Sequence, residues 1–403
     1  MYKKRIILLF VALLLLTNAF SFLLGNVITI QAGGKVLIPK GEYTVLSKLY
    51  QDNEKLVTVR RALDDMYLRE IDDDALREGQ IKGMVAALND PYSVYMSKKE
   101  YEDFNLETEG EYGGIGIMVT PGDDNLITVV SPIEDTPGER AGIKTGDKII
   151  SVDGEDYFAE NMDEAVSKMR GVPNTDVTIT IFRKLEGSSE TFDVTLTREL
   201  IKLISVKSAI VDNDIGYIRI TSFDVPTYDD FKTHLKALQS SDIKGLIIDL
   251  RNNPGGLMNV STDIADELLG KATIVYTEDK YGRKDYIYSN AAMVDLPLAI
   301  LINGGSASAS EILAGAIQDN SRGLLIGTTS FGKGVVQRLK PLSDGSGIKV
   351  TVSEYFTPSD KNIHGIGIEP DVVVELNEDA EGIGPDYFDE DNQLQTAVEE
   401  LRK

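Results

Sequence analysis

Short apolar runs alternate with helical stretches in the second half of the chain, and this alternation limits what the chain can fold into. The apolar runs after Val206 are IGYIRITSF, KGLIIDL, LPLAILIN, GLLIGT and IKVTVSEYF. Several are separated by stretches with helical spacing of apolar residues, such as YDDFKTHLKALQ and STDIADELLG. Strands that alternate with helices form layered α/β structures. We therefore predict an α/β core over residues 201–376.

Residues 302–337, INGGSASASEILAGAIQDNSRGLLIGTTSFGKGVVQ, contain the side chains best suited to chemistry. Ser308 follows a strand-like run and two glycines, and it precedes a helical pattern. Its hydroxyl would thus lie beside the free N–H groups of a helix start. Ser308 and Glu311 also form the S-x-x-E pattern of a capping box. This serine is therefore a helix cap, a nucleophile, or both.

A nucleophilic serine needs a neighbouring base, and the chain offers few. It has two histidines and no cysteine. His234 fits the surface of a helix and His364 fits a structural loop, although a histidine-based triad stays open. A lysine can replace histidine where burial disfavours its charged form. Lys333 suits this role because Gly332 and Gly334 on either side permit a close approach of backbone or substrate.

The same lysine ends a G-x-x-x-x-G-K pattern from Gly327 to Lys333, which is typical of a phosphate-binding loop. The next residue is Gly334, so the hydroxyl that would hold Mg²⁺ is missing. The following VVQRLKPL is β-branched and ends in proline, unlike a helix start. We therefore disfavour a phosphate site, and we predict neither a metal nor a cofactor.

Hydrolysis of an amide also needs donors for the developing oxyanion, often N–H groups on a glycine-rich turn. In GLIIDLRNNPGGLM, residues 245–250 predict a buried strand and residues 251–256 a turn at its carboxyl end. Ligands of α/β sheets bind at such ends. The N-N-P-G-G segment is, however, also an ordinary turn sequence.

GGSASASEI followed by GTTSFGKGVVQ resembles the catalytic signature of the carboxy-terminal processing proteases, also called tail-specific proteases. The resemblance implies that Ser308 is the nucleophile, that Lys333 is the general base and that Gln337 orients the lysine. It also implies a crotonase-like α/β fold for the core.

The resemblance further implies where the oxyanion donors lie. One is expected in the P-G-G turn, at the N–H of Gly255 with that of Gly256 as the second candidate. The other is expected at the N–H of Ala309, directly after the nucleophile.

Residues 106–200 resemble a PDZ domain. Its carboxylate-binding loop would be the segment Gly113, Gly114, Ile115, Gly116 and Ile117, and AGIKTGDKIISVDG would follow. Glycines leave successive N–H groups uncovered, so they can capture a terminal carboxylate while the peptide adds as a strand. A dinucleotide-binding pattern is disfavoured because Val119 stands where the last glycine is needed.

The helix of this domain is expected over residues 161–169. Val166 and Met169 either contact the last apolar side chain of a bound peptide or belong to the domain's core. Arg170 is the charge best placed to sense a bound peptide or to contact the protease domain.

The amino terminus predicts the compartment. Lys3, Lys4 and Arg5 precede an apolar run over residues 6–24 that is long enough to cross a bilayer as a helix. No convincing A-x-A cleavage site follows. We predict an uncleaved signal anchor over residues 1–25, which places a single-pass protein in a bacterial cell membrane with its catalytic part outside the cytoplasm. Without cysteine, no disulfide is expected.

Two further regions complete the chain. Residues 26–105 show helical periodicity and are expected to mediate homodimerisation or to cap the active site. Residues 377–403 are read as a solvated acidic loop before a short helix. A net charge of −24 argues against binding to nucleic acid.

Together these features predict a multidomain α+β protein with a membrane helix, a helical region, a PDZ domain and a protease core. Its predicted function is that of an extracytoplasmic serine endopeptidase that recognises free apolar carboxyl termini of proteins or peptides, with the PDZ domain gating access. The alternative is a membrane-tethered PDZ adaptor with an inactive protease-like scaffold. The sequence identifies no regulatory partner.

Overall fold

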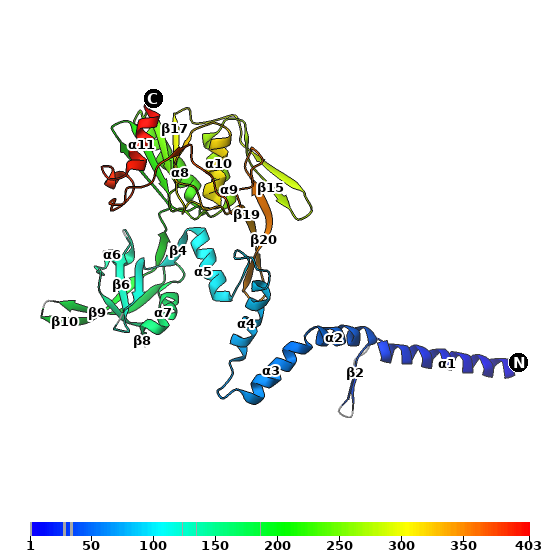
Figure 1. Ribbon diagram of the computed structural model, residues 1–403. Helices are drawn as coiled ribbons and strands as arrows, with labels where there is room; N and C mark the ends of the chain where they lie inside the picture. The colour runs from blue at the N-terminus through cyan, green and yellow to red at the C-terminus, as the bar shows by residue number, and fades with distance from the viewer. Residues whose placement is uncertain (1, 27–29, 33–34, 123, 134, 186) are drawn as a thin grey trace. The chain divides into compact units, whose positions relative to one another are not determined.

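The computed structural model describes residues 2–26, 30–32, 35–122, 124–133, 135–185 and 187–403 (Figure 1). The chain divides into two compact units, Met1–Gln80 and Ile81–Lys403. The second unit contains both the predicted PDZ domain and the predicted protease core. The multidomain α+β prediction is confirmed.

The first unit is mainly helical. It contains α1 (Tyr2–Asn26), the strand pair β1 (Ile30–Ala32) and β2 (Lys35–Leu37), α2 (Lys40–Asp52), α3 (Glu54–Met66) and the start of α4 (Asp73–Ala86). Neither α2 nor α3 has a buried residue. The predicted helical region is thus present, while its role in dimerisation or capping stays a prediction.

The amino-terminal segment differs from the prediction in one respect. Residues 2–26 do form a helix. Within the described residues, however, no helix is both long enough and apolar enough to cross a membrane. The predicted membrane span is therefore not supported.

The PDZ region follows β3 (Val94–Met96) and α5 (Lys98–Glu109). Its main sheet has the order β10-β9-β7-β6-β5, with β8 beside β7, and a separate pair joins β4 to β11. The strands are β4 (Glu111–Gly114), β5 (Ile117–Pro121), β6 (Ile127–Pro132), β7 (Lys148–Val152), β8 (Glu155–Asp156), β9 (Asp176–Leu185), β10 (Ser188–Thr197) and β11 (Glu199–Lys202); the helices are α6 (Pro137–Arg140), η1 (Ala159–Asn161) and α7 (Met162–Met169).

The protease region is built on a sheet of order β12-β13-β14-β17-β18-β21, in which β12 is antiparallel and the other strands run parallel. The strands are β12 (Val206–Val211), β13 (Ile215–Ile220), β14 (Gly245–Asp249), β17 (Leu298–Ile302), β18 (Leu324–Gly327) and β21 (Val372–Val373). The helices are α8 (Thr227–Gln239), α9 (Met258–Leu268), α10 (Ala309–Asp319), η2 (Pro385–Tyr387) and α11 (Asn392–Leu401).

Helices cover both faces of this sheet. Along β14, Leu246 and Ile248 face the apolar cluster under α8, α9 and α10, whereas Ile247 faces the cluster under α11. Parallel strands buried on both faces are expected to be continuously apolar, which explains the runs seen in the sequence. The predicted α/β core is therefore confirmed.

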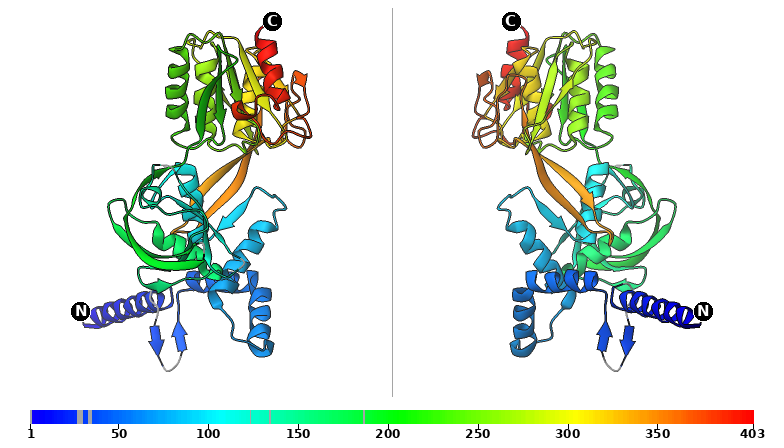
Figure 2. Two further views of the ribbon diagram at one scale, coloured as in Figure 1. Left: turned by 90° about the vertical axis from the view of Figure 1, so that its left-hand side faces the viewer. Right: turned by 90° about the vertical axis from the view of Figure 1, so that its right-hand side faces the viewer.

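A second sheet extends from this core. Its order is β16-β15-β20-β19. The short strand β3, from earlier in the chain, also pairs with β20. The strands are β15 (Thr273–Asp279), β16 (Lys284–Tyr288), β19 (Val335–Pro341) and β20 (Gly347–Phe356). Both views in Figure 2 show the long β19 and β20 pair, in orange, projecting from the core.

The acidic segment after Asn377 is not simply a solvated loop. Asp391 is fully buried and pairs with the guanidinium of Arg251 at 2.7 Å. A charge at this depth is retained only with an opposite charge beside it, and no local pattern in the sequence indicates a partner so far away in the chain.

Candidate active site

Three neighbouring parallel strands deliver the candidate residues to one edge of the sheet. β14 leads into the N-N-P-G-G turn, β17 into the segment that ends at Ser308, and β18 into the loop that carries Lys333. Carboxyl ends of adjacent parallel strands meet at the same edge, where α/β folds bind ligands. The structure thus brings together segments that the sequence separates widely.

Ser308 occupies the N-cap position of α10 with φ 55° and ψ −113°. A non-glycine residue held at positive φ costs about 1–3 kcal/mol, and such strain concentrates at functional sites. The Ser308 hydroxyl makes no cap hydrogen bond. The Ser308 N–H instead donates to Glu311 Oε2 at 2.9 Å. The hydroxyl is therefore available for chemistry.

The other two serines of the S-A-S-A-S segment are engaged. The Ser306 hydroxyl donates to the carbonyl of Leu250 at 2.8 Å, and the Ser310 hydroxyl donates to the carbonyl of Asn253 at 2.9 Å. Both side chains are buried. These two serines tie the start of α10 to the turn after β14, which leaves the middle serine as the candidate nucleophile.

The turn after β14 lies against the nucleophile. Gly255 has φ +106°, and a Cβ there would be 2.8 Å from the Ser308 Cβ and 3.0 Å from the Ala309 nitrogen. Only glycine permits this approach. The segment is therefore more than an ordinary turn.

The first choice of oxyanion donor needs correction. The Gly255 N–H already donates to Asn253 Oδ1 at 2.8 Å. Across the described part of the chain, the N–H groups of Gly256 and Ala309 form no hydrogen bond. The second candidate, Gly256, is thus the better placed, because its donor is free and the Gly255 donor is not.

Glu311 joins the two halves of the site. This fully buried carboxylate accepts hydrogen bonds from the N–H groups of Gly332 at 2.7 Å and of Lys333 at 2.9 Å, in addition to that of Ser308. In the sequence, Glu311 is recognisable only as part of a capping box. Its contact with the lysine loop was missed because nothing in the local pattern marks a partner in a distant segment.

Both glycines beside Lys333 allow close backbone contacts. A Cβ on Gly332 would lie 2.8 Å from the nitrogen of Gly367, and one on Gly334 would lie 2.8 Å from that of His364. The loop of residues 363–367 therefore fixes the lysine backbone from one side, while Glu311 fixes it from the other.

The Lys333 side chain is half-buried. Among the described residues its ammonium forms no hydrogen bond and no ion pair, and its Nζ lies 4.9 Å from the centre of the Tyr92 ring. Burial and then the nearby Lys349 lower the pKa of Lys333, while Glu311 and Asp90 partly oppose that shift. A lysine with a lowered pKa reaches its neutral, basic form at a lower pH.

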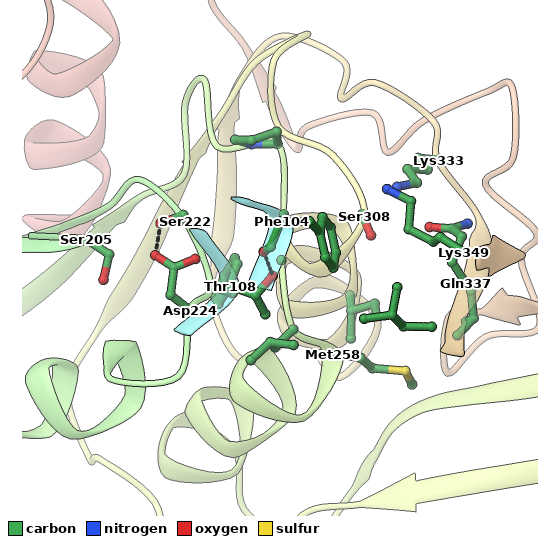
Figure 3. Close-up of a pocket in the computed structure, with 18 of the residues that line it drawn as sticks. Phe104, Thr108, Ser205, Ser222, Asp224, Met258, Ser308, Lys333, Gln337 and Lys349 are labelled. Carbon is green, nitrogen blue, oxygen red and sulfur yellow. Dashed lines mark hydrogen bonds between the residues drawn. The ribbon is translucent and has the colours of Figure 1, made fainter. Parts of the chain in front are cut away.

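Ser308, Lys333 and Gln337 line one pocket of about 710 Å³. Figure 3 shows these side chains near one another, with Lys349 beside them and Met258 below. The Gln337 side chain donates to the carbonyl of Val335 at 3.2 Å. The expected contact of Gln337 with Lys333 is thus not formed in this structure.

The rest of the pocket has two characters. Its apolar lining includes Met258, Ile312 and Val336, and its polar lining includes Ser205, Ser222 and Asp224. Figure 3 shows Ser205, Ser222 and Asp224 together on one side, and Phe104 and Thr108 of α5 also line the pocket. Phe104 belongs to the region of residues 26–105 that the sequence predicts to dimerise or to cap the active site, but no single residue of α5 was predicted as part of the site.

The alternative readings of the catalytic residues are not favoured. His234 lies on α8, where its Nδ1 hydrogen bonds with the Ser208 hydroxyl at 2.7 Å, and His364 is exposed. Neither histidine lines the pocket. After Lys333 the chain enters strand β19, so the helix that a phosphate-binding loop requires is not formed there.

The candidate carboxylate loop of the PDZ region spans the end of β4 and the start of β5. Gly113 and Gly114 lie in β4, Ile117 begins β5, and Ile115 and Gly116 connect them. The carbonyls of these two connecting residues accept from Gly138 at 2.7 Å and Ile133 at 2.9 Å. Their N–H groups form no hydrogen bond in the part of the chain that is described, as a carboxylate-binding loop requires.

The two apolar residues of the predicted groove behave differently. Met169 is 4% exposed and belongs to the core of the PDZ region, whereas Val166 is partly buried against that core. The structure thus favours the core interpretation for Met169. Val166 stays a candidate groove residue.

Arg170, directly after α7, contacts neighbouring segments. Its guanidinium pairs with Asp103 of α5 at 2.8 Å and lies 5.1 Å from the centre of the Tyr112 ring. The next residue of α5, Phe104, lines the pocket. Arg170 therefore connects the end of the PDZ helix to an element of the candidate active site.

Comparison with known proteins agrees with this geometry. Residues 214–374 match the family model described as Peptidase family S41, residues 128–183 match a PDZ domain, and residues 34–100 match the Activating protease CtpB N-terminal domain.

Several curated relatives are similar over most of the chain. The carboxy-terminal-processing protease of Bartonella bacilliformis is 44% identical over 77% of this chain and 72% of its own length. The carboxyl-terminal-processing protease of Synechocystis sp. is 40% identical over 73% of this chain and 70% of its own. The carboxy-terminal processing protease CtpA of Bacillus subtilis is 38% identical over 83% of this chain and 70% of its own length. The chain belongs to peptidase family S41, among the carboxy-terminal processing proteases, and is a serine-type peptidase with a PDZ domain.

Proposed function

We propose that this peptidase cleaves protein substrates with Ser308 as nucleophile and Lys333 as general base, after its PDZ domain has bound a free apolar carboxyl terminus. The observation that carries the proposal is that, among the described residues, the Lys333 ammonium is unpaired and half-buried in the pocket that contains Ser308. Its half-buried ammonium has no hydrogen-bond or ion-pair partner within the described residues, and it lines the same pocket as the Ser308 hydroxyl.

The proposed reaction begins when neutral Lys333 accepts the proton of Ser308. The Ser308 oxygen then attacks the carbonyl carbon of the substrate, and the N–H groups of Gly256 and Ala309 stabilise the oxyanion. Lys333 returns the proton to the leaving amine, and water hydrolyses the acyl-enzyme. Gln337 orients the lysine once its amide has turned away from the carbonyl of Val335.

The wall of the pocket supports a preference at the cleaved bond. Met258, Ile312 and Val336 surround the space beside Ser308 with apolar surface. A charged substrate side chain placed against this apolar surface would lose its hydration. We expect small or medium apolar residues to be accepted on the acyl side of the bond.

The proposed role of the PDZ domain rests on Arg170. A bound peptide next to α7 would alter the surroundings of this arginine, and its pairing with Asp103 connects it to α5. A carboxyl-terminal peptide that binds the PDZ domain is expected to stimulate cleavage of a second substrate at an internal bond. We expect Arg170→Ala to reduce this stimulation. Lys168→Ala, which removes an exposed charge of the same helix, is the matched control. Equal stimulation in both variants would contradict this role.

The proposed location is extracytoplasmic. It is supported by the basic residues 3–5 before the apolar run of residues 6–24. Accessibility of the full chain to an added protease in intact and in opened cells tests this location. Protection in intact cells of a single-membrane host would contradict it.

The catalytic assignment is tested by cleavage of an unfolded protein with an apolar carboxyl terminus. Ser308→Ala and Lys333→Met are each expected to reduce kcat at least about 10³-fold, because each removes a reacting group. Ser240→Ala and Lys271→Met, at exposed positions, are the controls. A Lys333→Met chain that keeps its activity would overturn the proposed base. An unsubstituted chain that binds peptides without cleaving any would support the adaptor alternative.

A further inference from the structure

We infer that the ring of Tyr92 is a positioning surface for Lys333, which holds the side chain as an ammonium group until base catalysis begins. This inference rests on the proposed function of Lys333 as the base. It concerns a residue outside the serine and lysine motifs, in the segment D-P-Y-S of residues 90–93.

The contact itself has the geometry of a cation–π interaction. The Lys333 Nζ lies 4.9 Å from the centre of the Tyr92 ring, within the range of about 6 Å in which such pairs attract. No hydrogen bond or ion pair of this ammonium competes with the ring among the described residues. The aromatic face is therefore the direct partner of the charged lysine in this structure.

The ring is held in place by a rigid turn. Asp90 accepts hydrogen bonds from the Tyr92 N–H at 3.0 Å and from the Ser93 hydroxyl at 2.6 Å. The Ser93 oxygen in turn accepts from the N–H of Thr351 at 3.1 Å. Ser93 is buried, and β3, which begins at the next residue, pairs with β20. The turn is therefore fixed to β20, the strand whose Thr351 pairs with Gln337 of β19.

Other charged groups also face the lysine, and they must be kept constant in any test. Lys349 of β20 disfavours the ammonium, whereas Glu311 of α10 and Asp90 of the turn favour it. The ring of His364 also packs edge-to-face against that of Tyr92, with the ring centres 6.2 Å apart. A substitution of Tyr92 leaves all four residues in the chain.

The ring affects the two forms of the lysine differently. An aromatic face attracts an ammonium group, and it has no comparable attraction for a neutral amine. Tyr92 therefore opposes the loss of the proton, so the base becomes available only at a higher pH than burial and Lys349 alone would set. Removal of the ring should lower the pKa of Lys333 and shift the rising limb of the kcat profile to lower pH.

The test compares Tyr92→Leu with Tyr92→Phe in the full chain. Tyr92→Leu is expected to move the midpoint of the rising limb down by about half a pH unit, the shift that corresponds to an exposed cation–π pair. This raises kcat about threefold at pH values well below the midpoint. Tyr92→Phe keeps the ring face and should leave the midpoint near that of the unsubstituted chain.

A readout independent of turnover is available. In a Ser308→Ala background, the pH dependence of Lys333 acetylation, followed by mass spectrometry, reports the pKa of its amine directly. A purely structural role for Tyr92 would lower kcat at every pH, and it would leave this titration unchanged.

A second set of variants covers the case in which Tyr92→Leu does not fold. Phenylalanines with increasing ring fluorination at position 92 retain the shape of the ring while they weaken its negative face. A progressive downward shift of the midpoint along this series supports the inference, and a constant midpoint overturns it. Activity that survives Lys333→Met would instead overturn the proposed function, so the two failures are distinguishable.

Discussion

At the scale of single residues, Glu311 shows how one buried carboxylate can organise a catalytic site without reacting. It accepts hydrogen bonds from the N–H groups of Ser308, Gly332 and Lys333 and from the Ser330 hydroxyl. These donors belong to the nucleophile segment and to the lysine loop. The spacing S-x-x-E correctly marks a helix start, but the segment that also binds this carboxylate cannot be identified from it.

Glu311→Gln should loosen the site. A carboxamide offers one acceptor oxygen where the carboxylate offers two, so at least one buried N–H would lose its partner. We expect the free energy of unfolding to fall by about 2 kcal/mol, measured by urea denaturation, together with a reduced kcat. Glu369→Gln, at an exposed position, is the control. A stability loss equal to that of the control would refute this role.

Lys349 should influence the pH profile in the direction opposite to Tyr92. Its ammonium is, after burial, a cause of the lowered pKa of Lys333. In Lys349→Met that repulsion is lost, so the pKa of Lys333 rises. We expect the midpoint of the rising limb of kcat to move up by roughly half a pH unit, the effect of a charge several ångströms away in a water-like medium. A downward or absent shift would show that Lys349 does not act on the base.

At the scale of secondary-structure elements, the strands of the main sheet were predictable from the sequence. The distant segments that complete the candidate site were not. β14 and β17 are buried on both faces and β18 is buried after Leu324, so their continuous apolar sequences identify them as parallel strands. The helix after Ser308 and the glycine-flanked Lys333 were also visible in the local sequence. Tyr92 and α5 were not, since their places in the site depend on contacts between segments more than 200 residues apart, such as β3 with β20.

The turn after β14 gives a prediction at this scale. In Gly255→Ala, the new methyl group would meet the carbonyl oxygen of Ala307 at 2.7 Å and the Ser308 Cβ at 2.8 Å, at a φ of +106°. The turn must shift and carry the neighbouring Gly256 donor with it. We expect kcat to fall by about 10²-fold or more, the usual cost of a lost oxyanion donor.

Gly282→Ala provides the matched comparison. Gly282 also has positive φ, at +75°, but the nearest atom to its Cβ would be 3.9 Å away. It should therefore lose a little stability and no activity. Equal losses of kcat in the two variants would mean that backbone strain alone, and not the position of the turn, causes the effect.

At the scale of the whole molecule, a buried ionic network joins the sheet to its last helix. Arg251 is fully buried between Asp249 and Asp391, and the hydroxyl of Tyr217 donates to Asp249 at 2.7 Å. Asp391 also caps α11 by accepting from the N–H of Leu394 at 3.0 Å. The short terminal helix was predicted from the sequence, but neither this cap nor the pairing of the aspartate with a guanidinium was.

Asp391→Asn should destabilise the fold strongly, because it leaves Arg251 with one carboxylate in a buried place. We expect a loss of about 3 kcal/mol in the free energy of unfolding, against almost none for the exposed Asp389→Asn. A loss within 0.5 kcal/mol of that control, roughly the scatter of surface substitutions, would contradict the assigned role.

The same network predicts a dependence on pH. Burial acts to raise the pKa of Asp391, but the Arg251 guanidinium outweighs it, so the pKa lies below its usual range. The stabilisation is therefore present above the unfolded-state pKa and is lost as the pH falls through the folded-state pKa. The difference between the unsubstituted chain and Asp391→Asn should shrink in acid, as measured by denaturation at several pH values.

The pairing of Arg251 with Asp391 also sets an order in time. The two residues are 140 positions apart in the chain. At a synthesis rate of about 5–20 residues per second, the arginine leaves the ribosome on the order of 10 s before its partner. Throughout that interval the guanidinium has the carboxylate of Asp249 beside it but lacks that of Asp391, so the buried network is incomplete. A newly made chain therefore contains Ser308 and Lys333 for several seconds before the residue that completes this network has been added.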